Sequence, residues 1–308
     1  MLITGIGGPA GLSVAESLRK AGNYYLIGVD CDPMVSNRFF PDKFTVVPPA
    51  SDDKFIPNLI KLSGSCNYLF CTVDEELPKV AEAVDNFKCK VFVSPPKTIE
   101  LCLDKFKTFK ALSRAGLPAP KTVTFELGIR GLHGFNFPLI VKPRTGRGSR
   151  NVFKIVSDRE LEAVSHLLRN RKLLIQEYVE GPEYTVDVLA DEESELVACV
   201  PRERVRIREG LTFVGRTVKD SRFEELAAKL AKALNLKYIF NFQCRGFELK
   251  ITEVNPRPSG TLILSTMAGV NMPEILVKGE LKPGAYLGKF KENLWLYRSL
   301  NNYVVELP

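Results

Sequence analysis

Oxygen-bearing side chains fall on two neighbouring segments late in the chain, in positions that suit a divalent metal ion. The segment ITEVNPRPSG begins at Ile251. Side chains of a strand alternate with a period of two, so we expect Ile251, Glu253 and Asn255 to point to one face. On the segment before it, Asn241 and Gln243 share a face in the same way. Mg²⁺ takes a few protein oxygens and completes its shell with phosphate and water. These two segments therefore predict a magnesium site, although Gln243 taken alone is more typical of a solvated side chain.

A lysine and a glycine-containing loop in the middle of the chain suit phosphate binding. Lys142 ends the apolar stretch PLIVK, where a lysine is either an edge residue or the partner of a buried anion. The loop PRTGRGSR follows directly and includes Arg147, Gly148 and Ser149. Its amides and arginines could bind phosphates, although GRGS alone is more typical of a simple turn.

A third stretch, LLIQEYVEGPEYTVDV, suits a purine nucleoside. Glu177 and Val179 lie at the end of an expected strand, and Glu183 follows a Gly-Pro turn. The backbone of such a strand end can bind a purine edge, and a later carboxylate can bind ribose hydroxyls. Each feature has an ordinary structural explanation by itself, but their joint order points to a nucleotide site.

This order of motifs resembles that of the ATP-grasp superfamily. Within it, the chain resembles the ATP-binding half of the carbamoyl phosphate synthetase large subunit and free-standing ATP-grasp carboxylate–amine ligases. The resemblance covers nearly the whole chain and is strongest in IVKPRTGRGSRNV, IQEYVEGPEYTVDV and FNFQC…ITEVNPRPSG. It implies a pre-ATP-grasp α/β domain followed by a small lobe and a large lobe that enclose the nucleotide.

The resemblance implies a role for each matching residue of the nucleotide site. Lys142 and Lys105 would contact the phosphates of ATP, and the glycine loop would close over them. The adenine would meet the backbone of Glu177 and Val179. Glu183 would bind the ribose.

The resemblance also implies a metal site and catalytic residues. Gln243, Glu253 and Asn255 would hold Mg²⁺, with Glu253 bridging two ions, and Mn²⁺ is an alternative metal. Arg257 would steady the transferring phosphoryl group and act with Lys142. Phosphoryl transfer needs positioning and charge neutralisation more than covalent catalysis, so no His or Cys nucleophile is required.

The implied activity is an ADP-forming ligase that phosphorylates a small carboxylate to an acylphosphate and joins it to a small amine. One alternative is a carboxylate or carbamate kinase that releases the acylphosphate. Another is a nucleotide-binding partner subunit with little turnover. The synthetase is far longer and has two grasp halves, so we do not expect this chain of 308 residues to make carbamoyl phosphate alone.

The residues that bind the substrates are predicted from their positions. The stretch VPRERVRIREG places alternate arginines on one face if it stays extended, and a solvated strand face is an equally weighted alternative. Loops at the carboxyl ends of the first sheet would face the same cleft, where Glu75 could meet an amine. The predicted substrate residues are Gly7, Gly8, Glu75, Arg202, Arg204 and Arg216.

The glycine loop GIGGPA near the start of the chain offers a competing interpretation. It fits G-x-G-x-x-G/A between a strand and a helix, and Asp30 ends the next strand, as in NAD-binding folds. However, Pro9 removes one amide donor from the loop, and no hydride-transfer residues follow. We therefore favour ATP over NAD.

The elements that must position these residues follow from periodicity. The first part alternates strands with helices, which predicts a parallel sheet, so the expected fold class is α/β with α+β lobes. We expect a pre-ATP-grasp domain over 1–95, a helical bridge over 96–120, a small lobe over 121–179 and a large lobe with the metal site over 180–308. The segments YIFNFQC and FELKITEVNP are expected to form an antiparallel hairpin that turns at Arg245–Gly246.

Composition sets the remaining expectations. The net charge of +7 comes from dispersed basic residues, which disfavours a nucleic-acid partner. Seven cysteines without a CxxC pair and only two histidines indicate reduced thiols and disfavour a zinc site. No apolar run has the length of a signal peptide or membrane span, so we expect a cytoplasmic protein without a membrane partner. A homodimer is left open.

Overall fold

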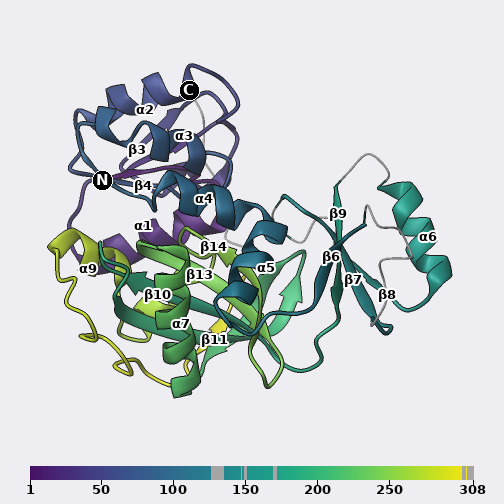
Figure 1. The fold of residues 1–308 in the computed structure, drawn as a ribbon. Coiled ribbons are helices and arrows are strands. Elements are labelled where there is room, and N and C mark those ends of the chain that lie inside the picture. The colour runs from purple at the N-terminus through teal and green to yellow at the C-terminus, as the bar shows by residue number, and fades with distance from the viewer. Residues whose placement is uncertain (126–134, 147, 149–150, 169–171, 300–302, 304–308) are drawn as a thin grey trace.

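Three β-sheets organise the chain in the computed structural model, which describes residues 1–125, 135–146, 148, 151–168, 172–299 and 303. A parallel sheet comes first, and two antiparallel sheets follow (Figure 1). This mixed architecture confirms the predicted fold class. Within these described residues, no helix is long and apolar enough to cross a membrane.

The N-terminal sheet has five parallel strands in the order β3-β2-β1-β4-β5. Its strands are β1 (Leu2–Ile3), β2 (Ile27–Asp30), β3 (Lys43–Val46), β4 (Tyr68–Phe70) and β5 (Lys90–Phe92). Its helices are α1 (Pro9–Ala21), η1 (Ser36–Phe39), α2 (Phe55–Ser63), α3 (Leu77–Glu82) and η2 (Val84–Asn86). The edge strand β3 was not predicted, because none of its four residues is buried.

The bridge to the next domain is two helices rather than one continuous helical segment. They are α4 (Pro96–Leu103) and α5 (Lys105–Arg114). Asp104 separates them because its backbone is extended and its carboxylate accepts the N–H groups of Phe106 and Lys107, which makes it the N-cap of α5. The break places Lys105 at the first position of α5.

The small lobe contains an antiparallel sheet in the order β6-β9-β7-β8, together with helix α6 (Figure 1). Its elements are β6 (Thr122–Thr124), β7 (Leu139–Pro143), β8 (Phe153–Ile155), α6 (Asp158–Leu167) and β9 (Leu173–Glu177). Lys142 lies on β7, which is an interior strand, so this lysine is not an edge residue.

The large lobe contains an antiparallel sheet in the order β14-β13-β10-β11-β12-β15. Its strands are β10 (Glu183–Ala190), β11 (Leu196–Arg208), β12 (Leu211–Thr217), β13 (Tyr238–Arg245), β14 (Lys250–Asn255) and β15 (Trp295–Tyr297). Its helices are α7 (Ser221–Leu234), α8 (Leu262–Met267) and α9 (Met272–Lys278). The short elements α8, α9 and β15 were not predicted.

The N-terminal domain shares a core with the large lobe. Val14 and Leu18 of α1 belong to the same buried cluster as Leu189 of β10 and Val197 of β11. Helix α1 lies between the two sheets (Figure 1) and packs on α8 and α9. This shared core docks the N-terminal domain onto the large lobe.

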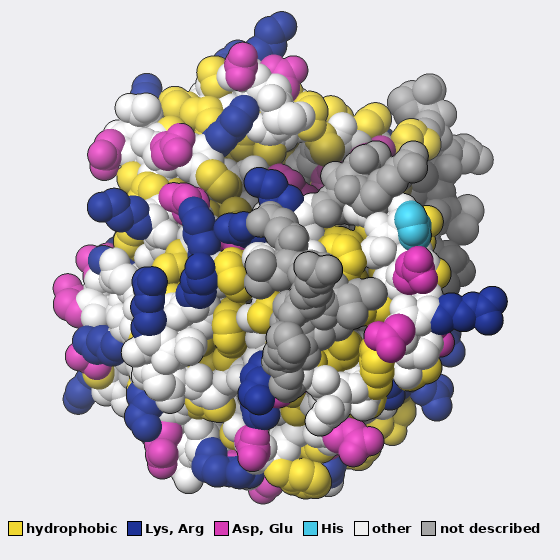
Figure 2. All heavy atoms as spheres, turned by 45° about the vertical axis from the view of Figure 1, so that its right-hand side comes forward, with side chains coloured by type: hydrophobic (Ala, Val, Ile, Leu, Met, Phe, Trp, Pro, Cys, Tyr) yellow, Lys and Arg dark blue, Asp and Glu magenta, His cyan; other side chains and the backbone are white. Residues whose placement is uncertain are grey.

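Basic side chains are spread out on the face of the protein that Figure 2 shows. Over the coloured part of the face in Figure 2, Lys and Arg lie among acidic and apolar side chains. This distribution agrees with the dispersed charge of the sequence.

Candidate active site

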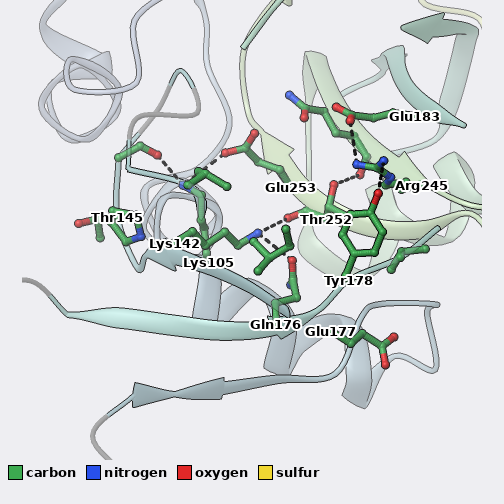
Figure 3. A pocket seen from close by; sticks show the side chains of 16 residues that line it. Lys105, Lys142, Thr145, Gln176, Glu177, Tyr178, Glu183, Arg245, Thr252 and Glu253 are labelled. Atoms are coloured by element: carbon green, nitrogen blue, oxygen red, sulfur yellow. Dashed lines mark hydrogen bonds and ion pairs between the residues drawn. The ribbon is translucent and has the colours of Figure 1, made fainter. Parts of the chain in front are cut away.

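A cavity of about 180 Å³ lies between the small lobe and the large sheet (Figure 3). Strands β7 and β9 form one wall and strands β13 and β14 the other. Two lysines lie beside Glu253 in this cavity, with Glu183 and Arg245 towards its other end. Its lining residues include Lys105, Lys142, Gly146, Gln176, Glu177, Val179, Glu183, Gln243 and Glu253.

The predicted hairpin of β13 and β14 is confirmed, and it brings the oxygen-bearing side chains together. Asn241 pairs with Asn255, and Gln243 pairs with Glu253. Directly paired residues of an antiparallel ladder point to the same face. The turn has four residues, 246–249, because Arg245 still belongs to β13.

The expectation that Ile251 shares the face of Glu253 is wrong, because the strand has a bulge at Thr252. The register shifts there, so that Ile251 pairs with Cys244, and both side chains join the buried core. At the bulge, the backbone carbonyl of Thr252 accepts a hydrogen bond from Lys142 Nζ at 3.2 Å. The irregular backbone thus helps to hold the lysine.

Lys142 is the buried charge of the cavity. Its side chain crosses from β7 towards β14 and also donates to Gln176 Oε1 at 3.0 Å. Burial lowers the pKa of Lys142 to about 8; nearby Glu253 opposes this shift, and nearby Lys105 adds to it. A lysine held in this way gains from an anion that enters the cavity.

Lys105 forms the boundary of the same cavity. Its ammonium group lies 3.3 Å from Glu253 Oε1 and donates to the carbonyl oxygen of Gly146. Arg144, in contrast, forms an ion pair with Asp104 through its Nε and Nη2 atoms, at distances of 2.7 to 2.9 Å. The pair anchors the start of the glycine loop to α5. The predicted phosphate-binding residues Arg147 and Ser149 lie outside the described residues; Gly148 is exposed.

The strand end predicted to meet adenine lines the cavity through Glu177, Tyr178 and Val179. The backbone N–H of Glu177 donates to Lys121 O at 3.0 Å, and its carboxylate pairs with Lys250 at 2.7 Å and points away from the two lysines (Figure 3). That N–H is therefore already used in the small lobe, which leaves Val179 as the better candidate donor.

The predicted ribose ligand Glu183 is linked to the predicted metal ligand Gln243 by Arg204. One guanidinium nitrogen of Arg204 donates to both side chains at 2.8 Å. Its other nitrogens donate to Thr212 Oγ1 and Gly210 O. Arg204 is therefore bonded to two side chains that line this cavity. The sequence could not predict this link, because it depends on the order of three strands.

The other two arginines predicted to bind substrate, Arg202 and Arg216, form ion pairs with acidic side chains of the sheet. Arg202 is buried, pairs with Asp187 at 2.6 Å, and donates to Ser259 and Thr261 in the loop after β14. Arg216 pairs across the sheet with Glu203 at 2.8 Å and stacks on Trp295. Glu203 neighbours Arg202 on β11, so Arg216 points to the opposite face.

The N-terminal glycine loop is closed by its own chain. Gly7 N–H donates to Asp30 Oδ2 at 2.9 Å, and Gly8 N–H donates to Gly5 O at 2.9 Å. A Cβ on Gly7 would lie 2.3 Å from a methyl carbon of Val35, so the glycine is required for close packing. The N–H groups of Gly7 and Gly8 are thus both used within the chain, and the predicted contact of these glycines with substrate stays a prediction.

A second cavity, of about 240 Å³, lies on the other side of Glu253. It shares four residues with the first cavity: Lys105, Thr145, Gly146 and Glu253. Its remaining lining comes from the N-terminal domain, α4 and β14: Asp74, Glu75, Cys102, Leu103, Val254 and Asn255. The predicted amine-binding residue Glu75 thus lies on its wall, and both cavities meet at the pair of Lys105 and Glu253.

The oxygen donors at the meeting point fit Mg²⁺ by their chemistry. Gln243 and Asn255 offer amide oxygens and Glu253 a carboxylate, all hard donors. Among the described residues, no group of three or more His, Cys, Asp or Glu side chains could hold a metal, so the set depends on the two amides. Lys105 and Arg204 contact Glu253 and Gln243, so a metal ion would replace these cations there.

Glu76 makes the stability of the N-terminal domain depend on pH. It is buried below Asp74, and burial raises its pKa from near 4.5 to about 7, against hydrogen bonds from Thr4, Val73 and Thr72. Between these pH values the folded chain holds a proton that the unfolded chain releases, so stability falls as pH rises. The shift corresponds to about 3 kcal/mol.

We expect Glu76→Gln to remove much of the loss of folding stability that occurs as pH rises. Thermal denaturation midpoints at pH 5 and pH 8 measure it: the wild type should lose more stability than the variant over this interval. Glu82→Gln, an exposed change on the neighbouring helix, is the control and should follow the wild type. Equal shifts in wild type and Glu76→Gln would contradict the assignment.

Three comparisons place this site among known proteins. Residues 169–295 match the model of a family described as ATP-grasp in the biosynthetic pathway with Ter operon. The chain is 30% identical over 233 residues to the carbamoyl phosphate synthase large chain of Caldanaerobacter subterraneus subsp. tengcongensis. This match covers 70% of the chain but only 22% of that relative's length.

Solved structures share the fold over nearly the whole chain. N5-carboxyaminoimidazole synthetase from Staphylococcus aureus, complexed with ADP, aligns with a TM-score of 0.73 at 17% identity, over 93% of this chain and 78% of that one. The biotin carboxylase domain dimer of Hydrogenobacter thermophilus 2-oxoglutarate carboxylase, in complex with MgADP and bicarbonate, aligns with a TM-score of 0.73 at 16% identity. That alignment covers 96% of this chain and 72% of the other.

Proposed function

Because this chain has the ATP-grasp fold, we propose that it is an ADP-forming ligase that uses ATP and Mg²⁺ to join a carboxylate to an amine. The observation that carries this proposal is the meeting of two cavities at Lys105 and Glu253. The first cavity would hold the nucleotide and the second the carboxylate. A phosphoryl group can pass between two ligands when both are held in line beside the same charged groups.

The nucleotide would lie with its phosphates at the lysines and its purine at the end of β9. Lys142 and Lys105 would place two positive charges beside the phosphates. The backbone near Glu177 and Val179 would meet the purine edge, and Glu183 would meet the ribose hydroxyls in place of its present contact with Arg204. The charge of the phosphates would favour protonated Lys142.

The residues at the meeting point would divide the work of phosphoryl transfer. Gln243, Glu253 and Asn255 would hold Mg²⁺, which neutralises phosphate charge when bound. Arg257, bonded to Asp74 in the lining of the second cavity, would steady the phosphoryl group. A carboxylate oxygen would attack the γ-phosphorus, and the bond from phosphorus to the departing ADP oxygen would break. The products of this step are an acylphosphate and ADP.

The amine would then complete the reaction in the second cavity. Its nitrogen would attack the acyl carbon, and the carbon–oxygen bond to phosphate would break with its electron pair leaving on phosphate. The amine would release a proton in this step. Glu75 on the wall of the cavity would attract the amine in its cationic form.

A second candidate, release of the acylphosphate without ligation, is favoured by the similarity to the carbamoyl phosphate synthase large chain. In that case the protein would act as a carboxylate or carbamate kinase. The nucleotide site, the metal ligands and the roles of the lysines would stay the same, and only the amine would be absent.

Screening pairs of small acids and amines, amino acids included, with ATP and Mg²⁺ tests the proposal. We expect ADP release that depends on the acid, together with a new amide detected by mass spectrometry. ADP without an amide, with the acylphosphate trapped by hydroxylamine, would show the kinase instead. Neither product with any pair would overturn both enzyme proposals and leave a nucleotide-binding subunit.

A further inference from the structure

Arg257 is fixed by a carboxylate from another domain. Its Nε and Nη2 atoms donate to the two oxygens of Asp74 at 2.7 and 3.0 Å, although the residues are 183 positions apart in the sequence. Its Nη1 atom donates to Pro258 O at 3.0 Å. Burial lowers the pKa of Arg257, but the pairing with Asp74 outweighs it, so the pKa is raised and the guanidinium stays charged.

The loop that presents Asp74 is itself held from below. Glu76 Oε1 accepts the backbone N–H groups of Thr72 and Val73 at 2.9 and 3.0 Å and the hydroxyl of Thr4. All of these contacts lie at the carboxyl ends of β1 and β4. The backbone around Asp74 is therefore held by these bonds, and the shared core docks its domain onto the large lobe.

The bonds to Asp74 and Pro258 use only some of the N–H donors of Arg257. A guanidinium has five N–H groups, and three of them are used by Asp74 and Pro258. Asp74 and Asn255 line the second cavity, so the guanidinium is bonded to a carboxylate of that lining. A bidentate carboxylate fixes the plane of an arginine as well as its position.

Two further carboxylates act on the charge of Arg257. The negative charges of Glu253 and Glu75 add to that of Asp74 in raising the pKa of Arg257, and Asp74 is the carboxylate that forms a bidentate bond with it.

We propose that Asp74 is a positioning residue that fixes the orientation of Arg257 beside the second cavity. This inference rests on the proposed ligase or kinase function. It gives the N-terminal domain a direct part in the reaction, because the loop after β4 supplies the group that orients the arginine. Asp74 itself would contact the reacting atoms only through Arg257.

The test is a set of variants assayed with the acid found in the screen. We expect Asp74→Asn, which keeps the shape but not the charge, to lower kcat by about 10- to 100-fold, with the Kd of MgATP unchanged within about twofold. Asp74→Glu should recover part of the loss. Combined with Arg257→Lys, Asp74→Asn should cost almost nothing further, because both changes remove one interaction. Asp53→Asn, on the exposed surface of the same domain, is the matched control.

Each outcome separates the role of Asp74 from the function itself. An unchanged kcat in Asp74→Asn, or full additivity with Arg257→Lys, would overturn the positioning role while the enzyme remains active. A purely structural role would lower the thermal midpoint of Asp74→Asn and Asp74→Glu alike without a selective loss of kcat, and this too would overturn the proposal. Absence of ADP release from the wild type with every acid would overturn the proposed function, and the role of Asp74 with it.

Discussion

Replacing Glu253 with alanine is expected to abolish ADP release while the fold is kept. Glu253 lines both cavities, is one quarter exposed and contacts Lys105, so its removal exposes no core. An ion pair of this exposure contributes at most about 1 kcal/mol to stability. Its loss would remove the only carboxylate of the metal site, and turnover should fall by about 10³-fold or more. A coupled assay for ADP and a thermal denaturation curve measure both effects.

The same hairpin offers a matched control for this variant. Glu248 lies in the turn and pairs with Lys250 at 3.3 Å, the distance that separates Glu253 from Lys105. Glu248→Ala therefore removes an ion pair of the same length, at a more exposed position outside the cavities, and should leave turnover near the wild-type value. Unchanged ADP release in Glu253→Ala would remove Glu253 from the metal site.

Replacing Lys142 with methionine is expected to weaken MgATP binding by about 30- to 150-fold, as the loss of one charge-assisted phosphate contact of about 2 to 3 kcal/mol implies. Stability should change less, because the loss of hydrogen bonds to Gln176 and Thr252 is offset by no longer burying a charge. Calorimetric titration with MgATP measures the affinity. Lys229→Met on the exposed face of α7 is the control.

The pKa of Lys142 adds a pH dependence to this prediction. Below its pKa of about 8 the amine is already charged, whereas above it MgATP must bind together with a proton. The Kd of the wild type should therefore rise as pH increases through 8, and the Kd of Lys142→Met should follow it less steeply. Titrations in buffers of different ionisation enthalpy would detect the proton. A Lys142→Met variant with wild-type affinity would exclude the lysine from the phosphate site.

Local pairing explains which parts of the site could be predicted from the sequence. Gln243 and Glu253 lie on strands joined by a short turn, so the sequence predicts that the two segments pair, but it does not predict which residues lie opposite each other. The bulge at Thr252 could not be predicted, because ITEVN alternates regularly. It arises because Ile251 packs into the core with Cys244, which requires one extra residue before Glu253.

Contacts between segments far apart in the sequence explain why the partners of Arg202, Arg204 and Arg257 could not be predicted. The same alternation places Arg202 and Arg204 on one face, yet one is buried against Asp187 and the other reaches Glu183. Which acidic partner each arginine finds depends on neighbouring strands, and the sequence does not give their order. Asp74 is a stronger case, because its pairing with Arg257 depends on the docking of the first sheet onto the large lobe.

The most direct measurement of the central claim is a calorimetric titration of the wild-type chain with ATP in the presence and absence of Mg²⁺, with NAD as the contrasting ligand. A nucleotide site between the two lobes predicts MgATP binding with a Kd in the micromolar range, about −8 kcal/mol, which weakens when Mg²⁺ is withheld. No binding of MgATP together with tight binding of NAD would contradict an ATP site between the lobes and would favour NAD binding at the glycine loop beside Asp30.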